Sequence, residues 1–183
     1  MANSKPAMLL KLALVSLALA PAAGVADGAK TTTTRLRFYM HDIVTPPPGG
    51  QATAVLVARG ATPLPGDPRT RFGDTFVIDD PLTEGPGAAS AAVGRAQGFF
   101  MFASQTELAL LLSVNMVFTA GPHNGSTVAV LARDAILDAV RELPVVGGTG
   151  GFRGVTGYSL LRTHSINTTA HNAVLLVDMY LKV

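Results

Sequence analysis

Acidic side chains interrupt apolar patterns at two places in the sequence. Asp42 continues the apolar alternation of Phe38 and Met40, and Asp134 follows the apolar stretch 128–130. Apolar surroundings disfavour the charged form of a carboxyl group, so its pKa rises and the group can act as a general acid near neutral pH. Arg141, a few residues further on, could orient a phenolate or a carboxylate. These three residues are the candidates for catalysis.

Each acid also has a simpler structural interpretation. Asp42 could cap the end of a strand or lie in a solvated loop. Asp134 precedes Ala135, Ile136 and Leu137, and could be the N-cap of a short helix. The residue pattern by itself favours these structural roles for both acids.

Local motifs for other chemistries are absent. The chain has no H-E-x-x-H, no G-x-S-x-G and no Walker loop. Of the four histidines, we expect His123 in a hairpin turn and His164 and His171 in solvent. His41 adjoins Asp42, but neighbours on a strand point to opposite faces. We therefore expect no metal ion and no cofactor.

A glycine-rich run is the least generic stretch of the chain. Five glycines lie within residues 147–154. Arg153 occupies the place of the third glycine of a dinucleotide fingerprint, so the run does not predict a phosphate site. Because glycine permits positive φ and close backbone approach, we predict a tight structural turn.

Short β-like segments separated by Pro and Gly fill the rest of the chain. The predicted strands are 36–43, 53–58, 72–79, 92–97, 99–104, 108–118, 127–131, 158–166 and 173–182. We predict a loop over 60–71, a strand end at 79–81 and a short helix or turn over 134–141. The pattern indicates an all-β domain, either a sandwich or a barrel.

The N-terminal region has the pattern of a targeting segment. Lys5 and Lys11 precede an apolar run that ends in small residues, which predicts a secretory signal peptide over residues 1–26. Residues 27–34 are predicted to be a flexible arm, and residues 35–183 a single domain. We therefore expect a secreted, extracellular protein without a membrane span.

Charge and cysteine content narrow the possible functions. The chain has 14 Lys and Arg against 12 Asp and Glu, and the predicted signal peptide contains two lysines and no acid. The remainder is formally neutral, so we expect no nucleic-acid partner. The chain has no cysteine, which excludes thiolate nucleophiles, thiolate metal clusters and stabilising disulfides.

Two sequons are compatible with secretion. Asn124 begins Asn-Gly-Ser and Asn167 begins Asn-Thr-Thr, each in a predicted loop. Both asparagines are candidate glycosylation sites.

Four motifs in order along the chain resemble the dirigent protein family of plants. Residues 38–43 read Phe-Tyr-Met-His-Asp-Ile, and residues 77–83 read Val-Ile-Asp-Asp-Pro-Leu-Thr. Residues 93–98 read Val-Gly-Arg-Ala-Gln-Gly, and residues 140–153 contain Arg-Glu-Leu-Pro-Val-Val-Gly-Gly-Thr-Gly followed by Phe-Arg. Together they span nearly the whole chain beyond the predicted signal peptide.

The resemblance implies an eight-stranded antiparallel β-barrel that forms a homotrimer in the apoplast. It implies stereoselective coupling of monolignol-type phenoxy radicals, such as those of coniferyl alcohol, to lignans, with a separate laccase or peroxidase as radical source. One alternative is a cyclase or dehydratase that forms quinone methides from isoflavonoid-type alcohols, as in pterocarpan formation. Another is a non-catalytic cell-wall or defence protein that binds phenolics.

The resemblance also suggests roles for particular residues. Asp42 matches the acid of the His-Asp-Ile motif, and Asp134 and Arg141 match an acid and an arginine thought to act on a quinone methide. Phe38, Phe100 and Phe102 are the expected apolar substrate contacts. The chain departs from the lignan-forming pattern by lacking a cysteine pair, by having Phe100 and Phe102 where tyrosines are common, and by having an acid at position 134, where many relatives have asparagine.

Overall fold

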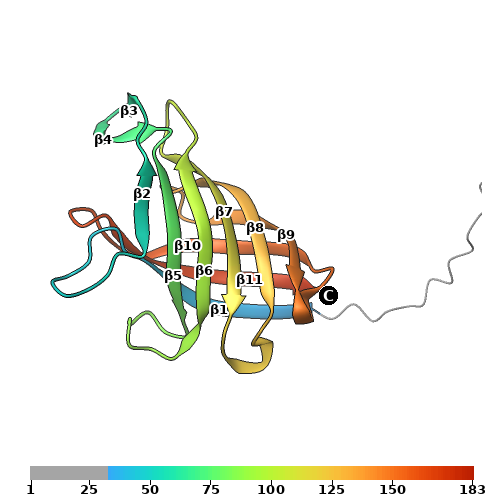
Figure 1. Ribbon diagram of the computed structural model, residues 1–183. Coiled ribbons are helices and arrows are strands. Elements are labelled where there is room, and N and C mark those ends of the chain that lie inside the picture. The colour runs from blue at the N-terminus through green and yellow to red at the C-terminus, as the bar shows by residue number, and fades with distance from the viewer. Residues whose placement is uncertain (1–32) are drawn as a thin grey trace, which may run out of the picture. The chain divides into compact units, whose positions relative to one another are not determined.

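The computed structural model describes residues 33–183, and these residues are almost entirely β (Figure 1). The strands are β1 (Thr33–Asp42), β2 (Ala54–Ala58), β3 (Thr62–Leu64), β4 (Asp67–Phe72), β5 (Thr75–Thr83), β6 (Ala92–Phe102), β7 (Ala109–Phe118), β8 (Thr127–Ala135), β9 (Arg141–Thr149), β10 (Thr156–Asn167) and β11 (Asn172–Lys182). Two 3₁₀ turns, η1 (Gly121–His123) and η2 (Gly150–Phe152), lie between strands. Residues 33–183 contain no helix long and apolar enough to cross a membrane.

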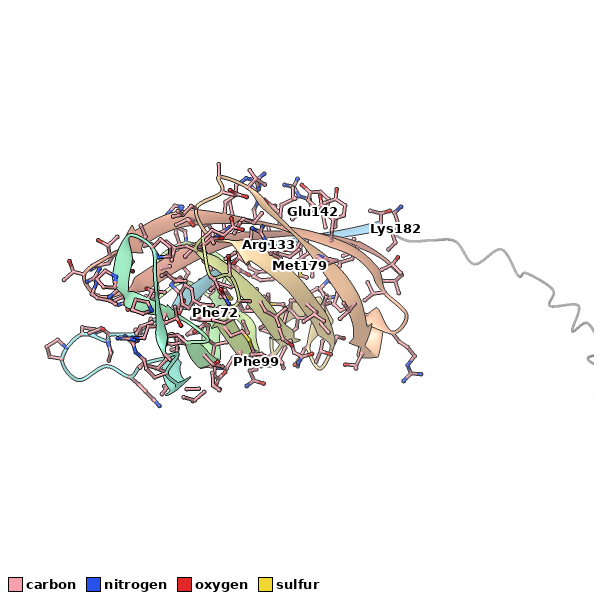
Figure 2. All side chains as sticks on the ribbon, turned by 90° about the horizontal axis from the view of Figure 1, so that it is seen from above. Phe72, Phe99, Arg133, Glu142, Met179 and Lys182 are labelled. Carbon is pink, nitrogen blue, oxygen red and sulfur yellow. The ribbon has the colours of Figure 1, made fainter. Side chains whose placement is uncertain are left out.

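Eight strands close into an antiparallel barrel, which confirms the predicted fold class. The sheet order is β1-β11-β10-β9-β8-β7-β6-β5, and β1 also pairs with β5 to complete the ring. Inward side chains alternate with outward ones, as a closed sheet requires. Figure 2 shows Met179, which is fully buried, within the ring of strands and Glu142, which is exposed, projecting away from it.

The pairing of β1 with β5 is short, and β2 pairs with a further part of β5. β1 pairs with β5 only through Tyr39 with Thr83 and Met40 with Leu82, whereas the pairing of β2 with β5 begins at Ile78. Pro81 lies in the gap between these two ladders. A proline without an N–H is tolerated where no partner strand requires one. The predicted strand end at 79–81 is therefore wrong, and β5 continues to Thr83.

Three other predicted boundaries are corrected by strand pairing. Residues 60–71, predicted as a loop, contain the β3–β4 hairpin, which lies beyond the end of β2 (Figure 1). The two segments predicted over 92–104 form one strand, β6, which pairs with β5 and β7 along its length. Residues 33 and 34 of the predicted arm already pair with β11. The predicted signal peptide and the rest of the arm lie outside the described residues.

Only the first residues of the predicted glycine turn, 147–149, belong to a strand. β9 continues to Thr149, and the turn is confined to the residues that follow, where Gly150 and Gly154 have φ of +62° and +76°. Gly148 is needed in the strand for a different reason. A Cβ on Gly148 would lie 2.6 Å from the Thr127 carbonyl oxygen and 2.7 Å from that of Phe152. Only glycine allows the backbones to approach this closely.

One end of the barrel is closed by a packed core. Phe118 lies between Phe38 and Phe152, with ring centroids 6.0 Å and 5.6 Å apart, and Met116 and Met179 are buried in the same cluster. Aromatic rings at this separation contribute stabilisation beyond the area that they bury. We call this region the closed end.

Candidate functional site

The opposite end of the barrel contains a cavity of about 570 Å³. Much of its wall is apolar and comes from inward positions of six strands, including Phe76, Phe100, Leu112, Leu161 and Leu175. This volume is within the range of sites for small organic ligands, and an eight-stranded barrel can hold one such ligand. We call this region the open end.

Asp42 is the last residue of β1 and lines this cavity. The alternation that places Phe38 and Met40 inside the barrel also turns Asp42 inward, as the sequence predicts. Its Oδ1 atom is buried and has no hydrogen-bond partner. Burial raises the pKa of Asp42 to about 7, because a charged carboxylate loses its hydration there.

His41, the neighbour of Asp42, faces a different environment. Its Nε2 lies 2.7 Å from the hydroxyl oxygen of Thr83. Burial lowers the pKa of His41. His41 is absent from the cavity wall, so the two neighbours do not act as a pair, in agreement with the strand geometry.

Asp80 is a second buried acid that the sequence analysis missed. It is 0% exposed and lies on β5 between the buried Ile78 and Leu82. Burial raises the pKa of Asp80 to about 8, and the nearby Asp42 carboxylate contributes to the rise. The Asp-Asp-Pro sequence suggested a strand end, but the alternation of Phe76, Ile78, Asp80 and Leu82 was the signal that it faces inward.

Asp134 and Arg141 form a buried ion pair in the cavity wall. Asp134 lies on β8 opposite Leu110, and Arg141 is the first residue of β9. Arg141 Nε lies 3.4 Å from Asp134 Oδ1, and the guanidinium also donates to Thr163 Oγ1 at 3.2 Å. The helix N-cap role considered for Asp134 is wrong, because strand pairing includes it in β8.

The ion pair leaves hydrogen-bonding capacity unused. Arg141 Nε and Asp134 Oδ1 are buried, and neither has a hydrogen-bond partner among the described residues. Burial raises the pKa of Asp134, and the adjacent guanidinium opposes this rise.

An aromatic wall lines the same cavity. Phe76 and Phe100 stack with centroids 4.9 Å apart, and Phe102 meets Phe100 edge-on at 6.3 Å. All three rings line the cavity, as expected for Phe100 and Phe102. Such a wall favours a flat aromatic ligand.

Phe38 is not part of this wall. It is 1% exposed and packs at the closed end, where it contacts Phe118. Phe38 and Asp42 are four residues apart on one inward face, and a strand advances about 3.3 Å per residue. The strand therefore carries Phe38 into the core, so its expected position beside a ligand is wrong.

The β3–β4 hairpin contributes polar groups to the cavity rim. Asp74 is buried and accepts hydrogen bonds from Arg59 Nη1 at 2.9 Å and from the Gly60 and Arg71 backbone N–H groups. Arg59 and Asp74 both line the cavity. These bonds hold the base of the hairpin in place, so the rim of the cavity has a fixed position.

Two further expectations concern features outside the cavity wall. Asn124 and Asn167 are exposed, as an acceptor for a glycan requires. Within residues 33–183, no three His, Cys, Asp or Glu side chains lie close enough together to hold a metal ion.

The fold and cavity define a class of ligand-binding β-barrel whose interior carries acids. Residues 33–182 match the family described as "Dirigent-like protein". Dirigent protein 21 of Arabidopsis thaliana is 45% identical over 148 residues, which cover 81% of this chain and 76% of that protein. Pterocarpan synthase 1 of Glycyrrhiza echinata is 40% identical over 152 residues, which cover 80% of this chain and 76% of that one.

A solved structure agrees with the sequence comparison. The pterocarpan synthase dirigent protein GePTS1 superposes with a TM-score of 0.74 at 38% identity, covering 83% of this chain and 90% of that one. The chain belongs to the dirigent family. This confirms the family indicated by the four sequence motifs.

Proposed function

We propose that this protein binds a phenolic alcohol in the open end and converts it, through a quinone methide, to a ring-closed product of defined stereochemistry. The observation that carries this proposal is the pairing of one free buried acid, Asp42, with one buried ion pair, Asp134–Arg141, in a single apolar cavity. The similarity to pterocarpan synthases supports it.

Asp42 serves as the general acid. Its raised pKa, about 7, keeps it protonated in mildly acidic solution. It donates its proton to the substrate hydroxyl that leaves, the carbon–oxygen bond breaks, and water departs.

Asp134 and Arg141 act on the phenol at the other end of the conjugated system. Asp134 accepts the phenol proton as the quinone methide forms, and Arg141 stabilises the negative charge that develops on the phenol oxygen during this transfer. A second hydroxyl of the substrate then attacks the exocyclic carbon and closes the ring. Its proton goes to the Asp42 carboxylate, and the phenol regains a proton from Asp134. The net change is the loss of one water molecule, and no oxidant is consumed.

The aromatic wall controls the stereochemistry. Phe76, Phe100 and Phe102 fix which face of the planar quinone methide the hydroxyl attacks, because holding the reacting groups in one geometry excludes the other product. The apolar surroundings also keep bulk water from adding to the electrophilic carbon.

The test is incubation with an isoflavonoid-type alcohol and no oxidase, with products separated by chiral chromatography. We expect a dehydrated, ring-closed product with one enantiomer in excess, and loss of that product with Asp42→Asn. Racemic product at the rate of a protein-free control would contradict the proposal. Unchanged activity in Asp42→Asn would exclude Asp42 as the general acid, and binding of the alcohol without turnover would instead favour a non-catalytic protein that binds phenolics.

Guided radical coupling is a second candidate. Two separate acidic centres, Asp42 and the Asp134–Arg141 pair, line one cavity of about 570 Å³, and each could serve one half of a bis-quinone methide formed from two monolignol radicals. The test is coniferyl alcohol with a laccase, with and without the protein. An enantiomeric excess of pinoresinol would support coupling, and a racemic product would contradict it.

The expected cellular setting is part of the proposal. We propose that the protein is secreted to the apoplast, glycosylated at Asn124 and Asn167, and assembled as a homotrimer. The exposure of both asparagines supports glycosylation. Mass spectrometry of the protein purified from plant tissue, before and after deglycosylation, would test the first two points, and light scattering the third.

A further inference from the structure

The buried aspartates of this barrel, together with the half-buried Asp42, fall into two groups. Asp74, Asp134 and Asp178 each lie beside an arginine, with nitrogen–oxygen distances of 2.9, 3.4 and 2.8 Å. Asp42 and Asp80 make no ion pair in the part of the chain described. A buried carboxylate without a cation is costly, whereas a neutral carboxylic acid is tolerated.

The contacts of Thr53 assign a proton to Asp80. The Ile43 N–H donates to Thr53 Oγ1 at 3.0 Å, and the same oxygen lies 3.2 Å from the His41 carbonyl oxygen and 2.5 Å from Asp80 Oδ1. A hydroxyl has one proton, so Thr53 can donate to only one of these two oxygens. All three contacts are satisfied when Thr53 donates to His41 and accepts a proton from a carboxylic acid on Asp80.

The same contacts fix the backbone on both sides of Asp42. His41 and Ile43 are its two neighbours, and both bond to Thr53. Thr53 is in turn held to β5 by the Asp79 N–H, which donates to its carbonyl oxygen at 2.8 Å. Asp80 therefore acts on Asp42 through Thr53.

The other charged groups near this pair do not supply a compensating charge. Arg95 lowers the pKa of Asp80 and Asp79 raises it, but these two residues pair with each other on the exposed face, with Nε and Oδ1 2.5 Å apart. On β1, burial favours the neutral form of His41 by lowering its pKa. Among charged groups, the interaction that remains on Asp80 is with the carboxyl group of Asp42, in addition to its hydrogen bond with Thr53.

We propose that Asp80 is a neutral carboxylic acid in the folded protein and is the positioning residue for Asp42. It holds the end of β1 through Thr53, and its lack of charge lets Asp42 ionise beside it when the proton passes to the substrate. The role in activity rests on the proposed function, whereas the protonation of Asp80 does not. Burial raises the pKa values of Asp42 and Asp80 to about 7 and about 8, in agreement with this assignment.

Carbon-13 NMR of protein labelled at the aspartate carboxyl carbons tests the protonation without substrate. The signal that disappears in Asp80→Asn is expected to remain protonated in the unmodified protein at pH 6 and to titrate near pH 8. Titration of that signal near 3.8, the ordinary value, would overturn the proposal. Asp79→Asn, which changes the outward neighbour, is the matched control and should leave the signal in place.

Thr53→Val tests the direction of the hydrogen bond and does not require Asp80→Asn to fold. If Thr53 accepts the proton of Asp80, removal of the hydroxyl destabilises the neutral acid, and the highest-titrating carboxyl signal moves to lower pH. A move to higher pH would mean that Thr53 donates to a carboxylate, which would overturn the proposal.

The positioning role is tested by the pH profile of activity. An amide at position 80 can still donate to Thr53, so Asp80→Asn should fold. Because two coupled acids titrate as a pair, removal of one should turn the alkaline limb of the profile from a two-proton step into a single-proton step. A limb that still involves two protons would overturn the role. Absence of turnover in the unmodified protein would count against the proposed function and leave the NMR result valid.

Discussion

The two ends of the barrel are built from the same eight strands but from different inward side chains. At the closed end, Phe38, Phe118 and Phe152 meet in a packed cluster. At the open end, inward positions on the same strands hold Asp42 and Asp134 around a cavity. The comparison shows that closing the sheet fixes where side chains point, whereas their size and charge decide whether an end stabilises the fold or binds a ligand.

The closed end and the open end contribute differently to the stability of the fold. Packed apolar side chains at the closed end contribute to stability directly. The open end buries acids, two of which have no cationic partner among the described residues. Functional sites are often less stable than the scaffold that supports them. We therefore expect substitutions at the closed end to affect folding, and substitutions at the open end to affect chemistry and pH dependence.

The largest expected effect on activity is that of Asp42→Asn. An amide cannot donate a proton as a general acid, so turnover should fall by about 10²–10⁴-fold. Ligand affinity should change little, because the amide keeps the shape of the side chain. Steady-state kinetics and calorimetric binding of the same phenolic would check both points. Strong activity in this variant would show that Asp42 is not the general acid.

The largest expected effect on stability is that of Phe152→Ala. Removing a fully buried aromatic ring leaves a cavity and should lower the free energy of unfolding by about 3–5 kcal/mol. Urea denaturation measures this change. Phe102→Ala at the half-buried open end is the matched comparison. An equal loss in both variants would contradict the division between the two ends.

A pH effect on stability should follow from Asp42 and Asp80. Both have pKa values raised above 3.8, to about 7 and about 8, so the folded protein keeps protons that the unfolded chain has already lost. The free energy of unfolding should therefore fall as pH rises from about 4 to about 8, by up to about 6 kcal/mol between pH 5 and pH 8 for the two groups together. Denaturation at these two pH values, compared with an Asp42→Asn, Asp80→Asn double variant, provides the check. A stability that rises with pH in this range would contradict the assignment.

The smallest expected effect is that of Phe102→Leu. A substitution between apolar side chains of similar size at a half-buried position should cost less than about 1.5 kcal/mol. The loss of one ring from the aromatic wall should nevertheless lower the enantiomeric excess of the product. Chiral chromatography and thermal unfolding of the same variant separate these two effects. A large stability loss with unchanged selectivity would place Phe102 in the scaffold and not in the site.

The sequence predicts most of the fold because period-two alternation is strong. It places Asp42 inside the barrel correctly, since the alternation of β1 continues through that residue. It fails at Pro81, because the gap between the β1–β5 and β2–β5 ladders that tolerates a proline results from long-range pairing. Because the strand was predicted to end at residues 79–81, the inward position of Asp80 was not predicted.

The site shows the same limit. Helix propensity after Asp134 suggested a cap, but pairing with Leu110 includes Asp134 in β8. Only the closed sheet brings Asp134 and Arg141 to one wall, and only the packing of aromatic rings shows that Phe38 belongs to the core. The family resemblance suggests Asp42, Asp134 and Arg141 as candidates, whereas the contacts of Thr53 depend on long-range packing that no sequence pattern predicts.

Methionine methyl NMR provides the most direct test of the division between the two ends. All three of Met40, Met116 and Met179 are buried, but Met40 lines the cavity and the other two are absent from its wall. On titration with an isoflavonoid-type alcohol or with coniferyl alcohol, the Met40 methyl signal should shift in a saturable manner while those of Met116 and Met179 stay in place. Shifts at Met116 and Met179 with none at Met40 would place the ligand at the wrong end and contradict the account.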